Sequence, residues 1–367
     1  MSSAIFRITL VCSILWIISG RSSQGSTVSS SAAEKNYQVY FGKSYRDFLP
    51  GSLMRLEVTF KNKTPGNLPV SQELAVLDSS GMKVWKTIIN IDMTPEGVSI
   101  IPLLIPVPKI QGRFTLTLGR SSDISSGVIP ALVFNVLQPK KSARLAKILV
   151  FSPDSETGLN TFLKTWGIKA PMFSWAQVLL CGKMSWQHFA DGNPEITQLV
   201  MRALKREMSV IFLDFNSSVL SGTARKKVSL PFGVTVNFIP EESPELSFIL
   251  KSTYPELVYN LQPGQVIRWN GDDGIIIPST DLRFEGKGVK ISAFASASEN
   301  SKRFPIVELT PLNGKGKLYI SQLITEGRLD EHIQLSRFKH EISAYDPMAV
   351  QFLLNLISAS VGNNLLK

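Results

Sequence analysis

Three short hydrophobic runs in the second half of the chain constrain its fold more than any other feature. They cover residues 147–152, 178–182 and 210–214, and each has the length of a fully buried strand. Between them lie segments 154–167 and 194–208, whose apolar residues recur at helical spacing. Strands that alternate with helices in this way predict a doubly wound α/β sheet.

The remainder of this half extends the same pattern. Residues 289–294, 305–309 and 317–321 are predicted as further strands, whereas residues 217–285 carry Pro and Gly throughout and are predicted as an insertion of loops and short elements. Asp346-Pro347 marks the start of a final helix, because Asp is a favoured N-cap and Pro is favoured at the first helical position.

The first half has a different pattern, with short strands and no helical periodicity. Asp78-Ser79-Ser80-Gly81 separates two apolar runs and predicts a hairpin, and residues 62–69 are predicted as a longer turn region. The apolar run 98–107 is interrupted by Pro102 and Pro106, which predicts an edge strand or an irregular one. Together these strands predict an immunoglobulin-like β-sandwich, with a small β-barrel as the alternative.

The N-terminus has the pattern of a secretory signal peptide. Arg7 precedes the apolar run 8–18, and small and polar residues follow. The run is shorter than the ~20 residues that a membrane-spanning helix needs. Ser23 and Gly25 fit the small-residue cleavage rule, so we expect a mature chain from Ser26 and an extracytoplasmic location, periplasmic or secreted. The alternative is an uncleaved anchor.

These patterns predict the following organisation. A signal peptide covers residues 1–25, a flexible leader rich in Ser, Thr and Ala covers 26–36, the sandwich covers 37–138, and the α/β domain covers 145–362. A short basic linker with Lys140 and Lys141 joins the two bodies.

Composition excludes several classes of protein. The chain has 39 Lys and Arg against 29 Asp and Glu, a net charge of +10, but the basic residues form short scattered runs without interleaved aromatic residues. Nucleic-acid binding needs a clustered basic surface, so none is expected. Two cysteines are too few for a disulfide scaffold or a multi-cysteine zinc module, and signal cleavage would leave Cys181 alone.

Two segments carry a family resemblance. Residues 314–323 (GKGKLYISQL) and 346–357 (DPMAVQFLLNLI) resemble the C-terminal accessory region of some bacterial family-two glycoside hydrolases. In that region a sandwich precedes a domain of class-I glutamine-amidotransferase-like, flavodoxin-like fold. The resemblance therefore implies this fold for residues 145–362, in a chain that has no catalytic barrel.

The same resemblance locates the amidotransferase machinery. It implies that the nucleophile elbow would lie near Asp214, where this chain has neither a cysteine nor flanking glycines. Gln322-Leu323-Ile324 stands where a His-x-Glu motif would follow the late strand. We therefore expect an amidotransferase-like scaffold without its catalytic residues.

Few residues are candidates for other chemistry. Cys181 and His188 could form a nucleophile–base pair, with Lys183 lowering the thiol pKa, although a buried strand-end cysteine is the simpler interpretation. Asp272 and Asp273, with Asp281 nearby, could act as paired carboxylates in sugar hydrolysis, although Asn270-Gly271-Asp272-Asp273-Gly274 is also typical of a tight turn.

No metal or cofactor is expected. The chain has three histidines, and the spacing of His332 and His340 matches no known zinc site. Three tryptophans in or beside predicted loops, Trp175, Trp186 and Trp269, are candidates for stacking on sugar rings, with burial in the core as the alternative.

These observations predict an exported, non-catalytic accessory or interaction protein linked to carbohydrate binding or processing. Its expected partner is a carbohydrate or an envelope protein, with no membrane span after signal cleavage. One alternative is a divergent hydrolase, glycosidase- or amidase-like, that uses Cys181 and His188 or the carboxylates near Asp272. The other is a structural or assembly protein of the cell envelope.

Overall fold

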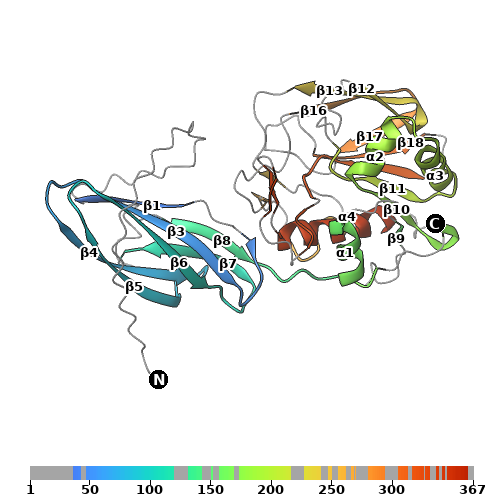
Figure 1. Ribbon diagram of the computed structural model, residues 1–367. Helices are drawn as coiled ribbons and strands as arrows, with labels where there is room; N and C mark the ends of the chain where they lie inside the picture. The colour runs from blue at the N-terminus through green and yellow to red at the C-terminus, as the bar shows by residue number, and fades with distance from the viewer. Residues whose placement is uncertain are drawn as a thin grey trace.

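The computed structural model describes two bodies joined by a short segment (Figure 1). The described residues are 36–42, 47–119, 131–142, 150–151, 157–168, 173–215, 227–240, 247–249, 255–261, 266–267, 269, 280–293, 305–312, 316–325, 327–330, 336–338, 341–343 and 345–362.

The first body consists of two β-sheets. One contains β1 (Tyr37–Phe41), β3 (Leu53–Asn62) and β6 (Val98–Pro106), in the order β1-β3-β6. The other has the order β2-β8-β7-β4-β5, with β2 (Asp47–Phe48), β4 (Leu68–Leu77), β5 (Lys83–Met93), β7 (Gly112–Leu118) and β8 (Ala131–Val136). Neighbouring strands are antiparallel except for β2 and β8, which are parallel.

Alternating burial along the strands makes these sheets a two-layer sandwich. Along β3 the buried side chains are every second residue from Met54 to Phe60, while Arg55 and Glu57 are exposed. The buried row shares one core with Leu74 and Phe114 of the other sheet. Two separate packed sheets favour the sandwich over the barrel; the immunoglobulin-like assignment remains a prediction.

Two local expectations can be compared with the strands. β6 lies at the edge of its sheet, as Pro102 and Pro106 predict. The predicted turn over 62–69 is shorter, because β3 extends to Asn62 and β4 starts at Leu68. The Asn62 amide closes this turn by donating to Gly66 O, and it also donates to Thr94 O after β5, both at 2.8 Å.

The second body is built on a six-stranded sheet of order β17-β18-β19-β11-β10-β9. Its strands are β9 (Val150–Phe151), β10 (Val178–Cys181), β11 (Ser209–Phe212), β17 (Val289–Ala293), β18 (Ile306–Pro311) and β19 (Lys317–Ser321). β9, β10, β11 and β19 are parallel, and β18 pairs antiparallel with both of its neighbours, β19 and β17. The predicted strands of this half all contribute to the sheet.

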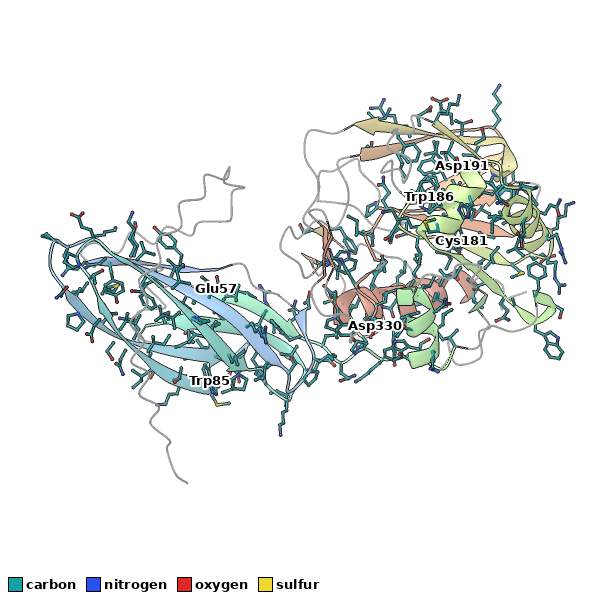
Figure 2. The ribbon with its side chains drawn as sticks, viewed as in Figure 1. Glu57, Trp85, Cys181, Trp186, Asp191 and Asp330 are labelled. Atoms are coloured by element: carbon teal, nitrogen blue, oxygen red, sulfur yellow. The ribbon has the colours of Figure 1, made fainter. Side chains whose placement is uncertain are left out.

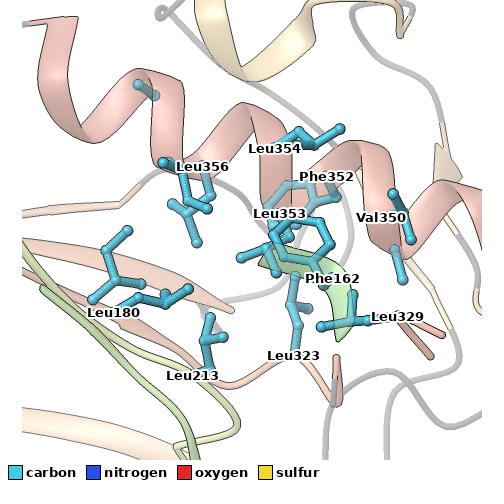
Figure 3. Close-up of a cluster of buried hydrophobic side chains, with 14 of the residues drawn as sticks. Phe162, Leu180, Leu213, Leu323, Leu329, Val350, Phe352, Leu353, Leu354 and Leu356 are labelled. Carbon is cyan, nitrogen blue, oxygen red and sulfur yellow. The ribbon is translucent and has the colours of Figure 1, made fainter. Parts of the chain in front are cut away.

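Helices cover both faces of this sheet. Leu180 and Leu213 pack on one face against α1 (Thr157–Thr165) and α4 (Pro347–Gly362), as the close-up of Figure 3 shows. Ile211 belongs to the same core. Leu179 and Phe212 pack on the other face with α2 (Lys183–Ala190) and α3 (Pro194–Lys205). The arrangement is a three-layer α/β body; its amidotransferase-like assignment remains a prediction. The sequence pattern did not predict α2.

The predicted insertion contains more sheet than expected. β12 (Lys227–Leu230), β13 (Val234–Pro240) and β16 (Thr280–Glu285) form a three-stranded antiparallel sheet that joins the core on the α2 and α3 side. The remaining short elements are β14 (Phe248–Ile249), β15 (Val266–Ile267), β20 (Ser336–Phe338), β21 (Glu341–Ser343), η3 (Phe173–Trp175), η4 (Pro231–Gly233) and η5 (Pro255–Val258).

Candidate functional site

The carboxyl ends of β10, β11 and β19 meet at one edge of the parallel sheet, the usual location of ligand sites in open α/β folds. Backbone hydrogen bonds join the segments that follow these strands. Leu213 N donates to Cys181 O at 2.9 Å, and Phe215 N donates to Ser321 O at 2.8 Å. Asp214, the residue expected near an elbow, therefore lies at the centre of this edge.

Asp214 turns the chain sharply without help from glycine. Its φ is +50°, in the left-handed region that Asp tolerates better than most residues, and its side chain is buried. One carboxylate oxygen of Asp214 accepts a hydrogen bond from Thr325 N at 2.7 Å. The backbone carbonyl of Asp214 accepts one from Trp186 Nε1 at 3.2 Å. The carboxylate thus joins the β11 and β19 segments, which is a structural role.

The candidate pair Cys181 and His188 occupies two different environments. Cys181 ends β10 and is fully buried in the core that contains Leu179 and Phe212 (Figure 2). His188 is exposed near the end of α2. A nucleophile must be reachable by its substrate. A molecule in solvent meets the imidazole but not the thiol.

The three tryptophan candidates also differ in exposure. Trp186 is fully buried, with its ring centroid 4.4 Å from that of Phe215. Trp269 is buried between Phe248 and Phe352, at centroid distances of 6.0 and 6.4 Å. Trp175 is 67% exposed, so of the three it is the one that offers a ring face to a ligand.

The carboxylate and histidine candidates fall mostly outside the described residues. Asp272, Asp273, His332 and His340 all lie there. Asp281 is half-buried on β16, opposite Ile239 of β13. Among the described residues, no three or more His, Cys, Asp or Glu side chains cluster to hold a metal ion, and no helix is long and apolar enough to cross a membrane.

A buried ion pair links β18 and β19. Glu308 is 4% exposed, and one of its carboxylate oxygens contacts Lys317 Nζ at 3.1 Å and accepts from Thr310 Oγ1 at 2.8 Å. Within the described part of the chain, the other carboxylate oxygen has no hydrogen-bond partner. The pair matches charges across adjacent strands inside the sheet, where an isolated carboxylate would be costly.

β6 carries an exposed apolar surface that was not predicted from the sequence, and we call it the β6 stripe. Its members are the outward-facing residues of this edge strand, Val98, Ile100, Pro102, Leu104 and Pro106. Val98, Ile100 and Leu104 are 58–60% exposed. The signal was present in the sequence, because the run is apolar at alternate positions that face away from the core as well as at those that face it.

Comparisons with known proteins leave the family open. No family model and no curated protein matches this chain. Matches among solved structures include a β-glucosidase from Listeria innocua, at a TM-score of 0.23 and 12% identity over 27% of this chain and 16% of that one. They also include a β-glucosidase from Erythrobacter marinus (TM-score 0.23, 12% identity, 28% and 16% covered).

A DNA glycosylase from Pseudomonas fluorescens matches at a TM-score of 0.24 and 11% identity, over 30% of this chain and 33% of that one. The chain thus spans a third or less of the length of these structures. Similarity at this level identifies no fold or function, so the candidate sites rest on the geometry of the chain itself.

Proposed function

We propose that this chain is an exported, non-catalytic accessory or interaction protein, linked to carbohydrate processing outside the cytoplasm. Export is supported by the basic, apolar and small-residue pattern of residues 1–26. The link to carbohydrate is supported by the resemblance of residues 314–323 and 346–357 to accessory regions of glycoside hydrolases. The interaction role is carried by one observation, the β6 stripe.

The β6 stripe has the composition of a protein-binding surface. Each aliphatic side chain moved out of water contributes about 1.5–3 kcal/mol when burial is complete. Charged residues Arg55, Glu57 and Lys61 border the stripe on the adjacent strand β3; Figure 2 labels Glu57. Protein interfaces typically have an apolar core surrounded by a polar rim.

The same strand limits how a partner can bind. Pro102 and Pro106 have no backbone N–H, so an added strand could not form a complete hydrogen-bond ladder along this edge. The partner is therefore a folded protein with an apolar face that packs on the side chains of β6, rather than an extended peptide that lengthens the sheet.

A substitution of the stripe tests this function. We would capture partners from the native envelope or secreted fraction, identify them, and measure the Kd of the purified pair for wild type and for Ile100→Ser/Leu104→Ser. The expected result is a Kd at least about tenfold higher in the variant. Leu312→Ser, which changes an equally exposed leucine on the other body, is the control.

Two outcomes would overturn the proposal. One is a partner whose Kd is unchanged by the double substitution. The other is turnover of glycosidic or amide substrates by the purified chain that is abolished by Cys181→Ser, which would favour the hydrolase alternative.

A further inference from the structure

A second exposed surface lies where η3 packs against the end of α3. We call it the η3–α3 surface and define it by Phe173, Ser174, Trp175, Arg202 and Arg206. Trp175 is 67% exposed, and Phe173 is half-buried against the core beneath α3. A tryptophan with most of its surface in water forgoes a large burial free energy, which makes it a candidate for ligand contact.

Two arginines are held against the two residues that precede this tryptophan. Arg202 and Arg206 are four residues apart at the end of α3, so they share one face of the helix. Their guanidinium carbons lie 5.1 and 5.7 Å from the centroid of the Phe173 ring. Arg206 Nη2 also donates to Ser174 O at 2.8 Å, which anchors η3 to the helix.

This arrangement gathers positive charge that is not neutralised. The guanidinium carbons of Arg202 and Arg206 lie 5.1 and 5.7 Å from the centroid of one aromatic ring, so this small surface carries two positive charges. Within the part of the chain that the structure describes, neither arginine forms an ion pair with a carboxylate. An anionic group that bridges the two guanidinium groups would relieve their repulsion and form charge-assisted, bidentate hydrogen bonds.

We propose that the η3–α3 surface binds an anionic polysaccharide, with a sugar ring stacked on Trp175 and its carboxylate or sulfate held by Arg202 and Arg206. This inference rests on the proposed link to carbohydrate and adds the chemical class of the ligand. The C–H groups on one face of a pyranose carry partial positive charge, which suits the electron-rich face of an indole. The net charge of +10 favours approach of a polyanion.

The small size of the surface favours a glycan over a nucleic acid. One aromatic ring and two guanidinium groups match one ring and one acidic group of a uronate or sulfated sugar. Nucleic-acid binding uses a longer basic track with several phosphate contacts. Single-stranded DNA is therefore a competitor in the test.

Calorimetric titration of the full chain with polyuronate oligosaccharides tests the proposal. We expect binding that weakens as salt is raised, since ionic contacts contribute, and no binding of neutral glucan oligosaccharides of equal length. Trp175→Ala and Arg202→Ala/Arg206→Ala should each raise the Kd at least about tenfold, the usual effect of losing a central contact. Trp175→Phe should retain most of the affinity.

A charge-matched variant separates a site from general attraction. Arg113→Ala/Arg283→Ala removes two exposed arginines elsewhere and should leave the Kd within about twofold of wild type, since scattered surface charges contribute little. An equal loss in both double variants would overturn the proposal, and so would tighter binding of single-stranded DNA through Trp175. If the polyuronate does not bind, but the Kd for the protein partner still depends on the β6 stripe, the glycan inference alone is overturned.

Discussion

The side-chain amide of Gln351 pairs with both backbone groups of Lys140, much as a neighbouring β-strand would. Its Oε1 accepts from Lys140 N at 2.7 Å, and its Nε2 donates to Lys140 O at 3.1 Å. Gln351 lies inside α4 and is fully buried, whereas Lys140 belongs to the predicted linker. The linker is therefore fastened to the second body.

Two further amides extend this contact. Asn260 Nδ2 donates to Gln351 Oε1 at 2.9 Å and to Gln138 O at 3.1 Å. Asn355 accepts from Gln351 at 2.9 Å and donates to Leu257 O and Tyr259 O at 2.9 and 2.8 Å. The network joins the linker, the η5 segment and α4, and it explains why a buried helix carries polar side chains.

Replacing the central amide should lower stability. Gln351→Ala removes both hydrogen bonds to the Lys140 backbone and one of the two acceptors of Asn260 Nδ2, and such loss of buried hydrogen bonds costs about 1–3 kcal/mol. The free energy of unfolding in urea measures the effect. Gln177→Ala, at an exposed position, is the control, and equal stability of the two variants would contradict the prediction.

The start of α4 depends on one carboxylate. Asp346 is fully buried, and its Oδ1 accepts from Met348 N at 2.8 Å and Ala349 N at 3.2 Å. Asp346→Ala should destabilise the protein by about 1–2 kcal/mol, because an N-cap acceptor is lost.

Two companion variants make this cap prediction specific. Asp346→Asn keeps an acceptor oxygen and should lose less stability in the same urea titration. Asn193→Ala removes the cap of α3, whose Oδ1 accepts from Glu195 N at 3.0 Å. Stability of Asp346→Ala equal to that of wild type would show that the cap contributes nothing.

The Cys181 thiol should be protected in the folded protein. It is fully buried in an apolar core, so a thiol reagent reaches it only after the surrounding structure opens. In the chain from Ser26, which carries Cys181 but not Cys12, we expect slow labelling of native protein and fast labelling in denaturant. The absorbance of the released chromophore measures both rates. Native labelling as fast as that of a free thiol would indicate an accessible, reactive cysteine.

The hairpin between β4 and β5 should make the stability of the protein depend on pH. Hydrogen bonds from the Ser80 hydroxyl and from Met82 N lower the pKa of Asp78 below its ordinary value of 3.8. The folded state therefore favours the charged form, so its contribution is present above pH 3.8 and is lost as the pH falls through the lower folded pKa.

Asp78→Asn, which does not titrate, isolates this contribution. The difference in melting temperature between wild type and this variant should shrink as the pH falls below 3.8. A difference that stays constant with pH would exclude Asp78 as the titrating group.

The candidate site could be predicted only in part. The left-handed backbone of Asp214 was not predicted, because the absence of glycine argued against a sharp turn there, whereas Asp tolerates positive φ. Trp175, Trp186 and Trp269 could not be ranked, because exposure depends on which other elements pack on each ring.

Local pattern alone determined the strands of the six-stranded sheet, the edge position of β6 and the capped start of α4, since period, proline and cap residues act over a few neighbouring positions. Only tertiary structure decided that Cys181 is enclosed, that the linker binds Gln351, and that Arg202 and Arg206 meet Phe173 beside an exposed tryptophan. Those contacts join residues distant in the chain, and packing between layers, which no local pattern specifies, brings them together.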